Sequence, residues 1–305
     1  MLGCAPHPQG ATLASVGAAQ ANASDCVVAD TSAPTPDTLY VIGVEQRGDT
    51  DAKTAGCAAH LSAPPVIVAD MPDSGADLRD VLDRGIPSAR APRPDVVITR
   101  DATVLAYATS STAYFTVALP YDRTYLLVAL DSGSAIPSQA ERDALARDAV
   151  TADARGAAAP FPWLTDPSCV ASLASPAAAP QSVVAYAAGD PIARQLAERV
   201  VALAGMRERP AWLPARLAPI AATPRIAPIA ADSMRDALAT GRVAAAVIAL
   251  PRDPRARCGT PGAPLAWRGV PLVDSRAHVI VRRGSGAAFI IGPDGTLRFV
   301  RRAAR

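Results

Sequence analysis

From about residue 38 onward, short apolar runs rich in Val and Ile alternate with segments whose hydrophobic residues recur at helical spacing. The runs are TLYVIGV (38–44), PVIVAD (65–70) and DVVIT (95–99). Each is followed by polar or turn-forming residues, which is typical of buried strands. A helix ending at Gly85 fits after the second run, and a helix capped by Asp101 fits after the third. The pattern predicts a mostly parallel sheet with helices on its faces.

The middle of the chain has a different pattern. The sequence AYFTVALPYDRTYLLVAL (113–130) holds two β-type runs separated by Pro-Tyr-Asp-Arg. This spacing predicts two extended segments that cross from one part of the molecule to another, and not a tight hairpin. Ser138 and Glu141 have the spacing of a capping box, from which we expect a helix to about Arg155.

A second α/β unit begins with a predicted strand over 182–187. Asp190 is placed to cap the helix that follows, and Gly205 is placed to end it. A further helix over 232–240 leads to a predicted strand over 243–250. Near the C-terminus, HVIVRRG predicts a strand and AAFIIGPDGTLRFV predicts a hairpin with a Pro-Asp-Gly turn.

Composition narrows the class of protein. The 305 residues are 50% hydrophobic and 19% charged, which is globular and allows two lobes of roughly 100 to 150 residues. The 30 basic and 28 acidic side chains give a net charge of +2, which argues against nucleic acid as a partner. No apolar stretch approaches the roughly 18 residues of a membrane-spanning helix, so we expect no spanning segment.

Residues 1–37 are rich in Ala, Ser, Thr and Pro and lack an apolar period, so we expect an export signal or tether there. Leu2-Gly3-Cys4 fits the end of a bacterial lipobox, in which the cysteine is lipidated. Ala21-Asn22-Ala23 fits a signal-peptide cleavage site. An ordinary cytoplasmic N-terminus is the third alternative. The first alternative predicts a lipid-anchored protein on the periplasmic or outer face of a membrane in the cell envelope.

The five cysteines bear on the same question. If Cys4 is lipidated or removed, four remain, namely Cys26, Cys57, Cys169 and Cys258. An even number is expected for two disulfides in an oxidising compartment, with three possible connectivities. Four free thiols in a reducing cytoplasm are the alternative.

Several segments together resemble a known family. VVAYAAGDPIARQLAERVVAL and DSMRDALATGRVAAAVIAL resemble the second lobe of bacterial extracytoplasmic solute-binding proteins, and among these the peptide and nickel binding family of ABC transporters. PLVDSRAHVIVRRGSG followed by GPDGTLRF is similar to the return of that family's chain to its first lobe. PDVVITRDATVLAYA looks like the lobe unit of type II periplasmic binding proteins. The chain is shorter than typical members and lacks a recognisable opening segment of their first lobe.

The resemblance implies a two-lobed α/β fold of the type II periplasmic-binding-protein kind, with mostly parallel sheets joined by crossing strands. Lobe 1 would comprise 38–120 plus 265–305, and lobe 2 would comprise 121–264. The implied function is capture of a small-molecule or peptide ligand in an interlobe cleft for an ABC permease. The protein would be a monomer that reaches the membrane only through a lipid anchor. The alternatives are an envelope lipoprotein whose degenerate binding fold serves protein contacts, and an uncharacterised enzyme.

Polar residues that follow strands or lie at the predicted crossover are the candidate ligand-binding groups. They are Arg100, Asp101, Tyr121, Asp122, Arg123, Tyr125 and Trp163. Arg100 can hold a carboxylate with two hydrogen bonds, and the stretch Tyr-Asp-Arg-Thr-Tyr offers aromatic faces and a carboxylate to a peptide-like or cationic ligand. Each residue also has a structural alternative as a helix cap, an ion-pair partner or a packing residue.

Motifs for catalysis are absent from the sequence. There is no G-x-S-x-G elbow, no P-loop and no dinucleotide-binding glycine pattern. The three histidines, His7, His60 and His278, lie far in sequence from any candidate nucleophile or second metal ligand. We therefore expect a protein that is not an enzyme and that has no catalytic residue, metal or cofactor.

Overall fold

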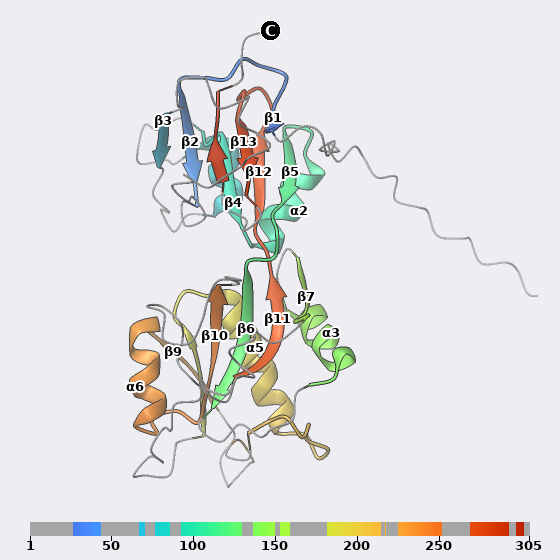
Figure 1. Ribbon diagram of the computed structural model, residues 1–305, viewed down its shortest axis with the longest axis vertical. Coiled ribbons are helices and arrows are strands. Elements are labelled where there is room, and N and C mark those ends of the chain that lie inside the picture. Colours follow the sequence, from blue (N-terminus) through green and yellow to red (C-terminus); the bar gives the residue numbers. More distant parts are fainter. Residues whose placement is uncertain are drawn as a thin grey trace, which may run out of the picture.

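The computed structural model describes residues 27–43, 67–70, 77–85, 93–129, 137–149, 153–158, 182–214, 217, 225–251, 269–292 and 297–301. These residues form two lobes that lie end to end along the long axis and are joined at a narrow waist (Figure 1). Each lobe is built on its own sheet, and helices cover one or both faces of it.

The first lobe has three layers. Its central sheet consists of β2 (Thr38–Ile42), β3 (Ile67–Asp70), β4 (Val96–Thr99), β5 (Tyr114–Ala118) and β12 (His278–Arg282), in the order β3-β2-β4-β12-β5. β2 is parallel to β3 and β4, whereas β12 is antiparallel to β4 and β5. The helices α1 (Leu78–Arg84) and α2 (Ala102–Ser110) cover one face. A small sheet covers the other face, made of β1 (Val27–Ala29), β13 (Ala288–Ile291) and β14 (Leu297–Phe299).

The alternation of side chains along β4 shows why its sequence is apolar throughout. Val97 packs in the cluster that contains residues of α1 and α2, whereas Val96 and Ile98 pack in the cluster that contains Phe289 and Phe299. Successive strand residues point to opposite faces, so a strand covered on both sides needs apolar residues at every position. All four residues of β4 are buried.

The second lobe has a six-stranded sheet in the order β7-β11-β6-β10-β8-β9. Its strands are β6 (Arg123–Ala129), β7 (Ala154–Gly156), β8 (Val183–Ala187), β9 (Arg225–Ile229), β10 (Ala245–Pro251) and β11 (Gly269–Ser275). The helices α3 (Gln139–Asp148) and α5 (Pro191–Ala204) contribute to the core on one face. The short 3-10 helix η5 (Ala231–Ser233) and α6 (Met234–Ala239) lie along the chain between β9 and β10, and α6 packs on the other face.

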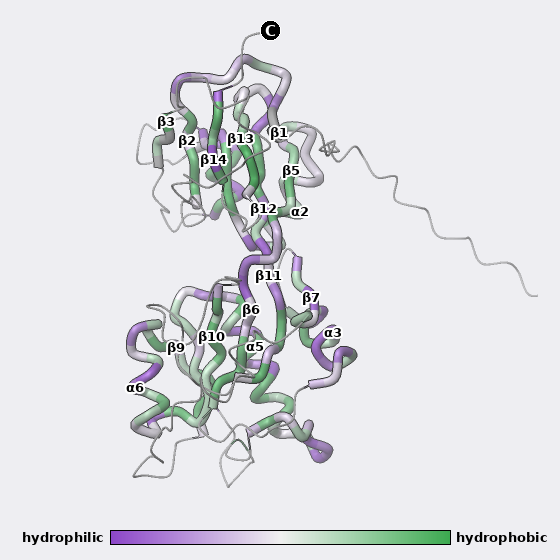
Figure 2. The backbone as a smooth tube through the Cα atoms, viewed as in Figure 1, coloured by the Kyte–Doolittle hydropathy of each residue, from purple (hydrophilic) through white to green (hydrophobic). Residues whose placement is uncertain are grey.

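The chain crosses the waist through two segments. The first leads from β5 in the first sheet to β6 in the second, and the other leads from β11 in the second sheet to β12 in the first. This confirms that the stretch 113–130 holds two crossing strands and no hairpin. Figure 2 shows hydrophilic residues in the waist, between the hydrophobic strands of the two lobes.

The two sheets share one strand order, which fixes the fold class. Three parallel strands come first, as β3-β2-β4 in one sheet and β9-β8-β10 in the other. Beside them lies the antiparallel strand that enters from the other lobe, β12 or β6. Next lies the strand that leaves for the other lobe, β5 or β11. The chain therefore has the expected two-lobed α/β fold of the type II periplasmic-binding-protein kind.

The N-terminal segment departs from the expectation for 1–37. Val27–Ala29 forms β1, which pairs antiparallel with β13. Asp30 then accepts a hydrogen bond from Gly286 N at 3.0 Å, and its own N–H donates to Ala287 O at 2.8 Å. These contacts stabilise a strand of only three residues. So short a strand has no apolar period from which it could be predicted.

Two further boundaries differ from expectation. α3 begins with the predicted capping box between Ser138 and Glu141, but it ends at Asp148, and Ala154–Gly156 forms β7. The prediction of a helix to Arg155 was wrong because β-branched Val150 and Thr151 have low helix propensity and β7 gains a partner in β11. The structure also places Gly269–Ser275 in the second lobe, although we expected residues after 264 to belong to the first.

Candidate ligand-binding site at the hinge

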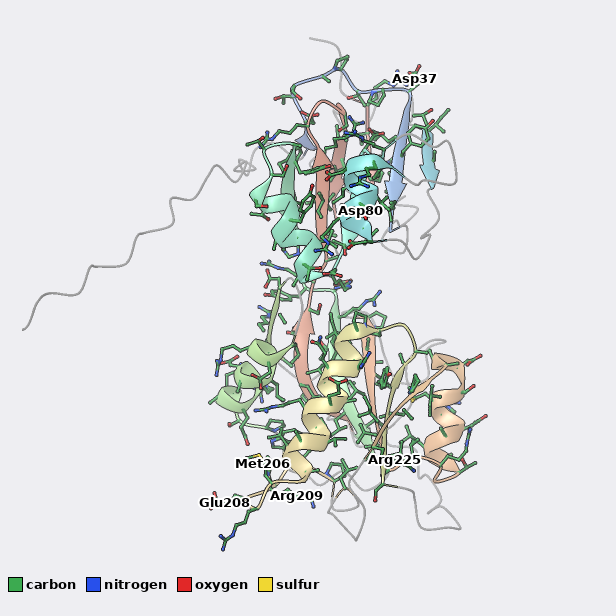
Figure 3. The ribbon with its side chains drawn as sticks, turned by 180° about the vertical axis from the view of Figure 1, so that it is seen from behind. Asp37, Asp80, Met206, Glu208, Arg209 and Arg225 are labelled. Atoms are coloured by element: carbon green, nitrogen blue, oxygen red, sulfur yellow. The ribbon has the colours of Figure 1, made fainter. Side chains whose placement is uncertain are left out.

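The waist is lined by residues from both crossing segments and from the starts of two helices. α2 begins two residues after Arg100, which contacts both crossing segments. α5 begins directly after its cap Asp190, whose carboxylate accepts a hydrogen bond from Tyr125 in β6. The N-termini of α2 and α5 therefore both meet the hinge, one from each lobe. Figure 3 shows Met206, Glu208 and Arg209 at the opposite end of the second lobe, beyond α5.

Arg100 connects the first lobe to both crossing segments. Its Nη2 atom donates to Asp122 Oδ2 at 2.5 Å, and its Nη1 atom lies 3.5 Å from Ser275 Oγ. The side chains of Arg100 and Asp122 are only 15% and 18% exposed, so solvent screens their Coulombic attraction less than that of a typical surface pair. The pair holds the end of β4 against the segment between β5 and β6.

Asp153 connects the second lobe to both crossing segments. Tyr121 from the first segment donates its hydroxyl to Asp153 Oδ1 at 2.9 Å. Arg276 from the other segment forms an ion pair with Asp153 Oδ2 through Nη2 and a hydrogen bond through Nε at 2.5 Å. Burial and the neighbouring Asp153 raise the pKa of Tyr121, so the hydroxyl remains protonated and can donate.

Two guanidinium groups lie against the ring of Tyr121. The Cζ atom of Arg155 is 3.9 Å from the ring centroid, and that of Arg276 is 4.8 Å from it. Arg155 also donates from Nε to Asp274 Oδ2 at 3.3 Å. Its side chain is 45% exposed, so an anchored guanidinium faces solvent beside the hinge.

Asp274 is fully buried near the end of β11 and is held by several groups of the second lobe. Thr124 donates its hydroxyl to Asp274 Oδ1 at 2.6 Å, and the backbone N–H of Ala158 donates to Oδ2 at 3.2 Å. With Arg155, these contacts join β6, β7 and β11 at the end of the sheet that faces the hinge. A buried carboxylate is tolerated there because its oxygens are satisfied.

Tyr125 and Asp190 connect β6 to the start of α5. The Tyr125 hydroxyl lies 3.1 Å from Asp190 Oδ2, while Asp190 Oδ1 accepts from the N–H groups of Ile192 and Ala193. Burial and the Asp190 carboxylate raise the pKa of Tyr125 well above its usual value. Asp101 has the corresponding role in the first lobe, where its carboxylate accepts from the N–H groups of Thr103 and Val104.

Both helices begin with the aspartate that was expected to cap them, so a carboxylate occupies each helix start. Asp101 is exposed and Asp190 is half-buried, so a ligand between the lobes would meet carboxylates at both helix starts.

The structure brings six of the seven candidate residues to the waist or to its immediate neighbours. Arg100 and Asp122 form an ion pair, Tyr121 binds Asp153, and Tyr125 is buried against Asp190. Asp101 is a helix cap, and Arg123 is half-buried at the start of β6. Trp163 lies outside the described residues, as do the lipidation candidate Cys4 and the disulfide candidates Cys26, Cys57, Cys169 and Cys258.

Several hinge residues were not predicted from the sequence. They are Asp153, Arg155, Asp274, Ser275, Arg276 and His278. Asp153 and Arg155 fell inside a helix that we expected to continue past Asp148. The polar run Asp-Ser-Arg-Ala-His lies between two apolar strands. This pattern could have predicted the second crossing segment.

The described residues contain neither a metal-binding cluster nor a membrane-spanning helix. No group of three or more His, Cys, Asp or Glu side chains in this part of the chain could hold a metal ion. Among the helices within the described ranges, none combines the length and hydropathy that crossing a bilayer requires.

Comparisons with known proteins gave likenesses of low score. No protein-family model and no curated protein matched the chain. Among solved structures, Tv2483 bound to L-arginine shows a TM-score of 0.34 at 9% identity, covering 82% of this chain and 79% of that one. AppA from Clostridium difficile, described as a peptide binding protein, shows 0.33 at 12% identity, covering 60% and 39%. Full-length OxyR from Pseudomonas aeruginosa shows 0.35 at 16% identity, covering 84% and 62%. The fold class follows from the strand order itself, since TM-scores below 0.5 do not establish a common fold.

Proposed function

We propose that the protein is an extracytoplasmic solute-binding protein that captures a small ligand between its lobes. The observation that carries this proposal is the pair of crossing segments, β5 to β6 and β11 to β12, which meet the starts of α2 and α5 at one waist. Two lobes joined only by such segments can rotate as rigid bodies about a hinge. A ligand that contacts both lobes stabilises the closed arrangement, and a permease can then recognise that arrangement.

The charges at the waist favour a ligand that carries a cationic group. Asp101 and Asp190 place carboxylates at the two helix starts, whereas the ring of Tyr121 is already covered by Arg155 and Arg276. Arg155 adds a half-exposed guanidinium that can bind a carboxylate. A peptide-like zwitterion, with an ammonium group at one end and a carboxylate at the other, satisfies both requirements.

We propose that this capture takes place in the cell envelope and serves an ABC transporter. The support is the Leu2-Gly3-Cys4 sequence, the Ala21-Asn22-Ala23 sequence, and the even number of cysteines beyond Cys4. Metabolic labelling with a lipid precursor and cell fractionation test this location. Four free thiols and a cytosolic fraction would contradict it.

A thermal-shift screen of the purified full chain tests ligand binding. Peptides, amino acids, sugars and metal chelates are added one class at a time. A ligand at about 100 times its Kd should stabilise the folded chain by about 2.7 kcal/mol. We expect a shift from peptides or amino acids, and compaction of the same complex in small-angle X-ray scattering. No shift from any class would overturn the solute-binding proposal.

A pair of variants tests the ligand chemistry. Asp101→Asn keeps a residue that caps helices well but removes the charge, so it should weaken binding of an ammonium-bearing ligand at least tenfold with little loss of stability. Asp236→Asn makes the same change at an exposed residue in the first turn of α6 and should leave affinity unchanged. Equal affinities for the two variants would contradict a role for Asp101 in binding.

A further inference from the structure

His278 lies at the hinge, where the two lobes meet. It is the first residue of β12, where the second crossing segment enters the first sheet, and it is 7% exposed. Its Nε2 atom lies 3.8 Å from Asp153 Oδ2, which is too far for a hydrogen bond. Its Nδ1 atom is buried and has no hydrogen-bond partner among the described residues. The imidazole therefore lies close to the Asp153 carboxylate without forming a hydrogen bond to it.

The groups that face His278 come from each element packed around it. Asp153 from the second lobe favours the protonated imidazole, whereas Arg276 from the crossing segment and Arg100 from the end of β4 disfavour it. Its direct neighbours across the sheet, Thr99 of β4 and Ala118 of β5, are uncharged. Burial, supported by the two guanidinium groups, lowers the pKa of His278, so the imidazole is neutral near pH 7.

Asp153 is the group through which a charge on His278 would act. Its Oδ2 atom forms the ion pair with Arg276 and is also the oxygen next to His278 Nε2. Its Oδ1 atom accepts a hydrogen bond from the Tyr121 hydroxyl. Asp153 belongs to the second lobe, and β12 belongs to the first. A change in how Oδ2 is shared therefore changes a contact between the lobes.

We propose that His278 is the proton-sensing group of the hinge, and that its protonation alters the relative orientation of the two lobes. A protonated imidazole adds a positive charge beside Arg276 and Arg100. It also has two N–H donors, and the one at Nδ1 has no acceptor among the described residues. A hydrogen bond from Nε2 to Asp153 requires the two atoms to approach by about 1 Å. That approach competes directly with Arg276 for Oδ2.

The consequence for ligand affinity rests on the proposed solute-binding function, whereas the change in lobe orientation does not. A ligand that stabilises one orientation binds less tightly when protonation favours another. Mildly acidic pH would then release ligand from a protein that binds it near neutrality.

The experiment measures the ligand-free full chain by small-angle X-ray scattering between about pH 8 and about pH 5, a range that spans histidine titration. We expect the radius of gyration to change with a midpoint below 6.5, the ordinary pKa of the imidazole. His278→Gln should abolish the transition, because glutamine keeps a donor but cannot take up a proton. His60→Gln removes a different histidine of the sequence and should leave the transition in place.

A second variant tests the proposal even if His278→Gln does not fold. Asp153→Asn leaves His278 able to titrate, which proton NMR of its ring can follow, but removes the charge that the imidazolium would attract. The transition in scattering should disappear while the titration in NMR remains. A transition that persists in either variant, or its absence from the wild-type chain, would overturn the proposal. If the scattering transition is present but the thermal-shift screen finds no ligand, the proposal for His278 holds. Only the proposed solute-binding function would then be wrong.

Discussion

The Tyr121 hydroxyl donates a hydrogen bond to Asp153 Oδ1 at 2.9 Å and so fastens the first crossing segment to the second lobe. Tyr121→Phe removes this bond but keeps the ring against Arg155, so the free energy of unfolding should fall by about 1 kcal/mol. The scattering profile of the ligand-free protein should also change, because one restraint on the hinge is lost. Tyr107→Phe is the matched control, since the Tyr107 hydroxyl bonds Asp83 within the first lobe. A similar change in scattering from both variants would contradict a specific role for Tyr121 at the hinge.

Asp190 serves both as the cap of α5 and as the partner of buried Tyr125. Asp190→Ala should lower the free energy of unfolding by about 2 to 3 kcal/mol, because it removes the cap and leaves the Tyr125 hydroxyl without an acceptor. Asp190→Asn keeps the cap and an acceptor and should cost less than about 1 kcal/mol. Urea denaturation of both variants measures the difference. Equal losses would show that the negative charge, and not the cap, is the important property.

The fully buried Asp274 is expected to contribute strongly to stability. Asp274→Ala leaves the buried Thr124 hydroxyl and the Ala158 N–H without their acceptor, and should cost about 2 to 3 kcal/mol. Asp148→Ala breaks a half-exposed surface pair with Arg199 and should change stability by no more than about 0.5 kcal/mol. Chemical denaturation compares the two. A loss for Asp274→Ala as small as that of the control would refute this role.

Substitutions at Gly284 and Gly286 distinguish the cost of backbone strain from the cost of a steric clash. Gly286 has φ of 67°, and a Cβ atom there would lie 2.0 Å from Pro34 O, whereas Gly284 has φ of 83° and open space. Gly284→Ala should cost about 1 kcal/mol, and Gly286→Ala about 2 to 4 kcal/mol. Gly286→Ala should also speed proteolysis near Asp30, because the clash displaces the segment that Gly286 holds. Similar proteolysis of the two variants would argue against this packing.

The lowered pKa of His278 predicts a dependence of stability on pH. The unfolded chain takes up a proton at this histidine near its ordinary pKa of 6.5, and the folded chain does so only at lower pH. Stability contributed by the neutral imidazole is therefore present above 6.5 and is lost as pH falls through the folded pKa. Denaturation of wild type and His278→Gln at about pH 7.5 and about pH 5.5 measures this loss. The wild type should lose more stability than the variant, and His60→Gln should behave as the wild type does.

The sequence predicted the elements well where strong local chemistry defines them. Asp101 and Asp190 cap the helices that they were expected to cap, and the crossing strands around Tyr121 were anticipated from their separation by Pro-Tyr-Asp-Arg. The contacts of Asp153 were not predictable, because its partners are 32 and 123 residues away along the chain. Long-range contacts of this kind depend on how two lobes meet, and no local pattern encodes that.

The central position of β12 also has a consequence for the order in which the protein is made and folds. The second lobe comes from one continuous stretch of chain between the crossing segments, so it can complete its sheet while synthesis continues. The first lobe cannot, because β12 lies between β4 and β5 and is made after the whole second lobe. Until β12 arrives, β4 and β5 each present an unpaired edge to which another strand can add. The part of the chain that leaves the ribosome first is therefore the part that finishes folding last.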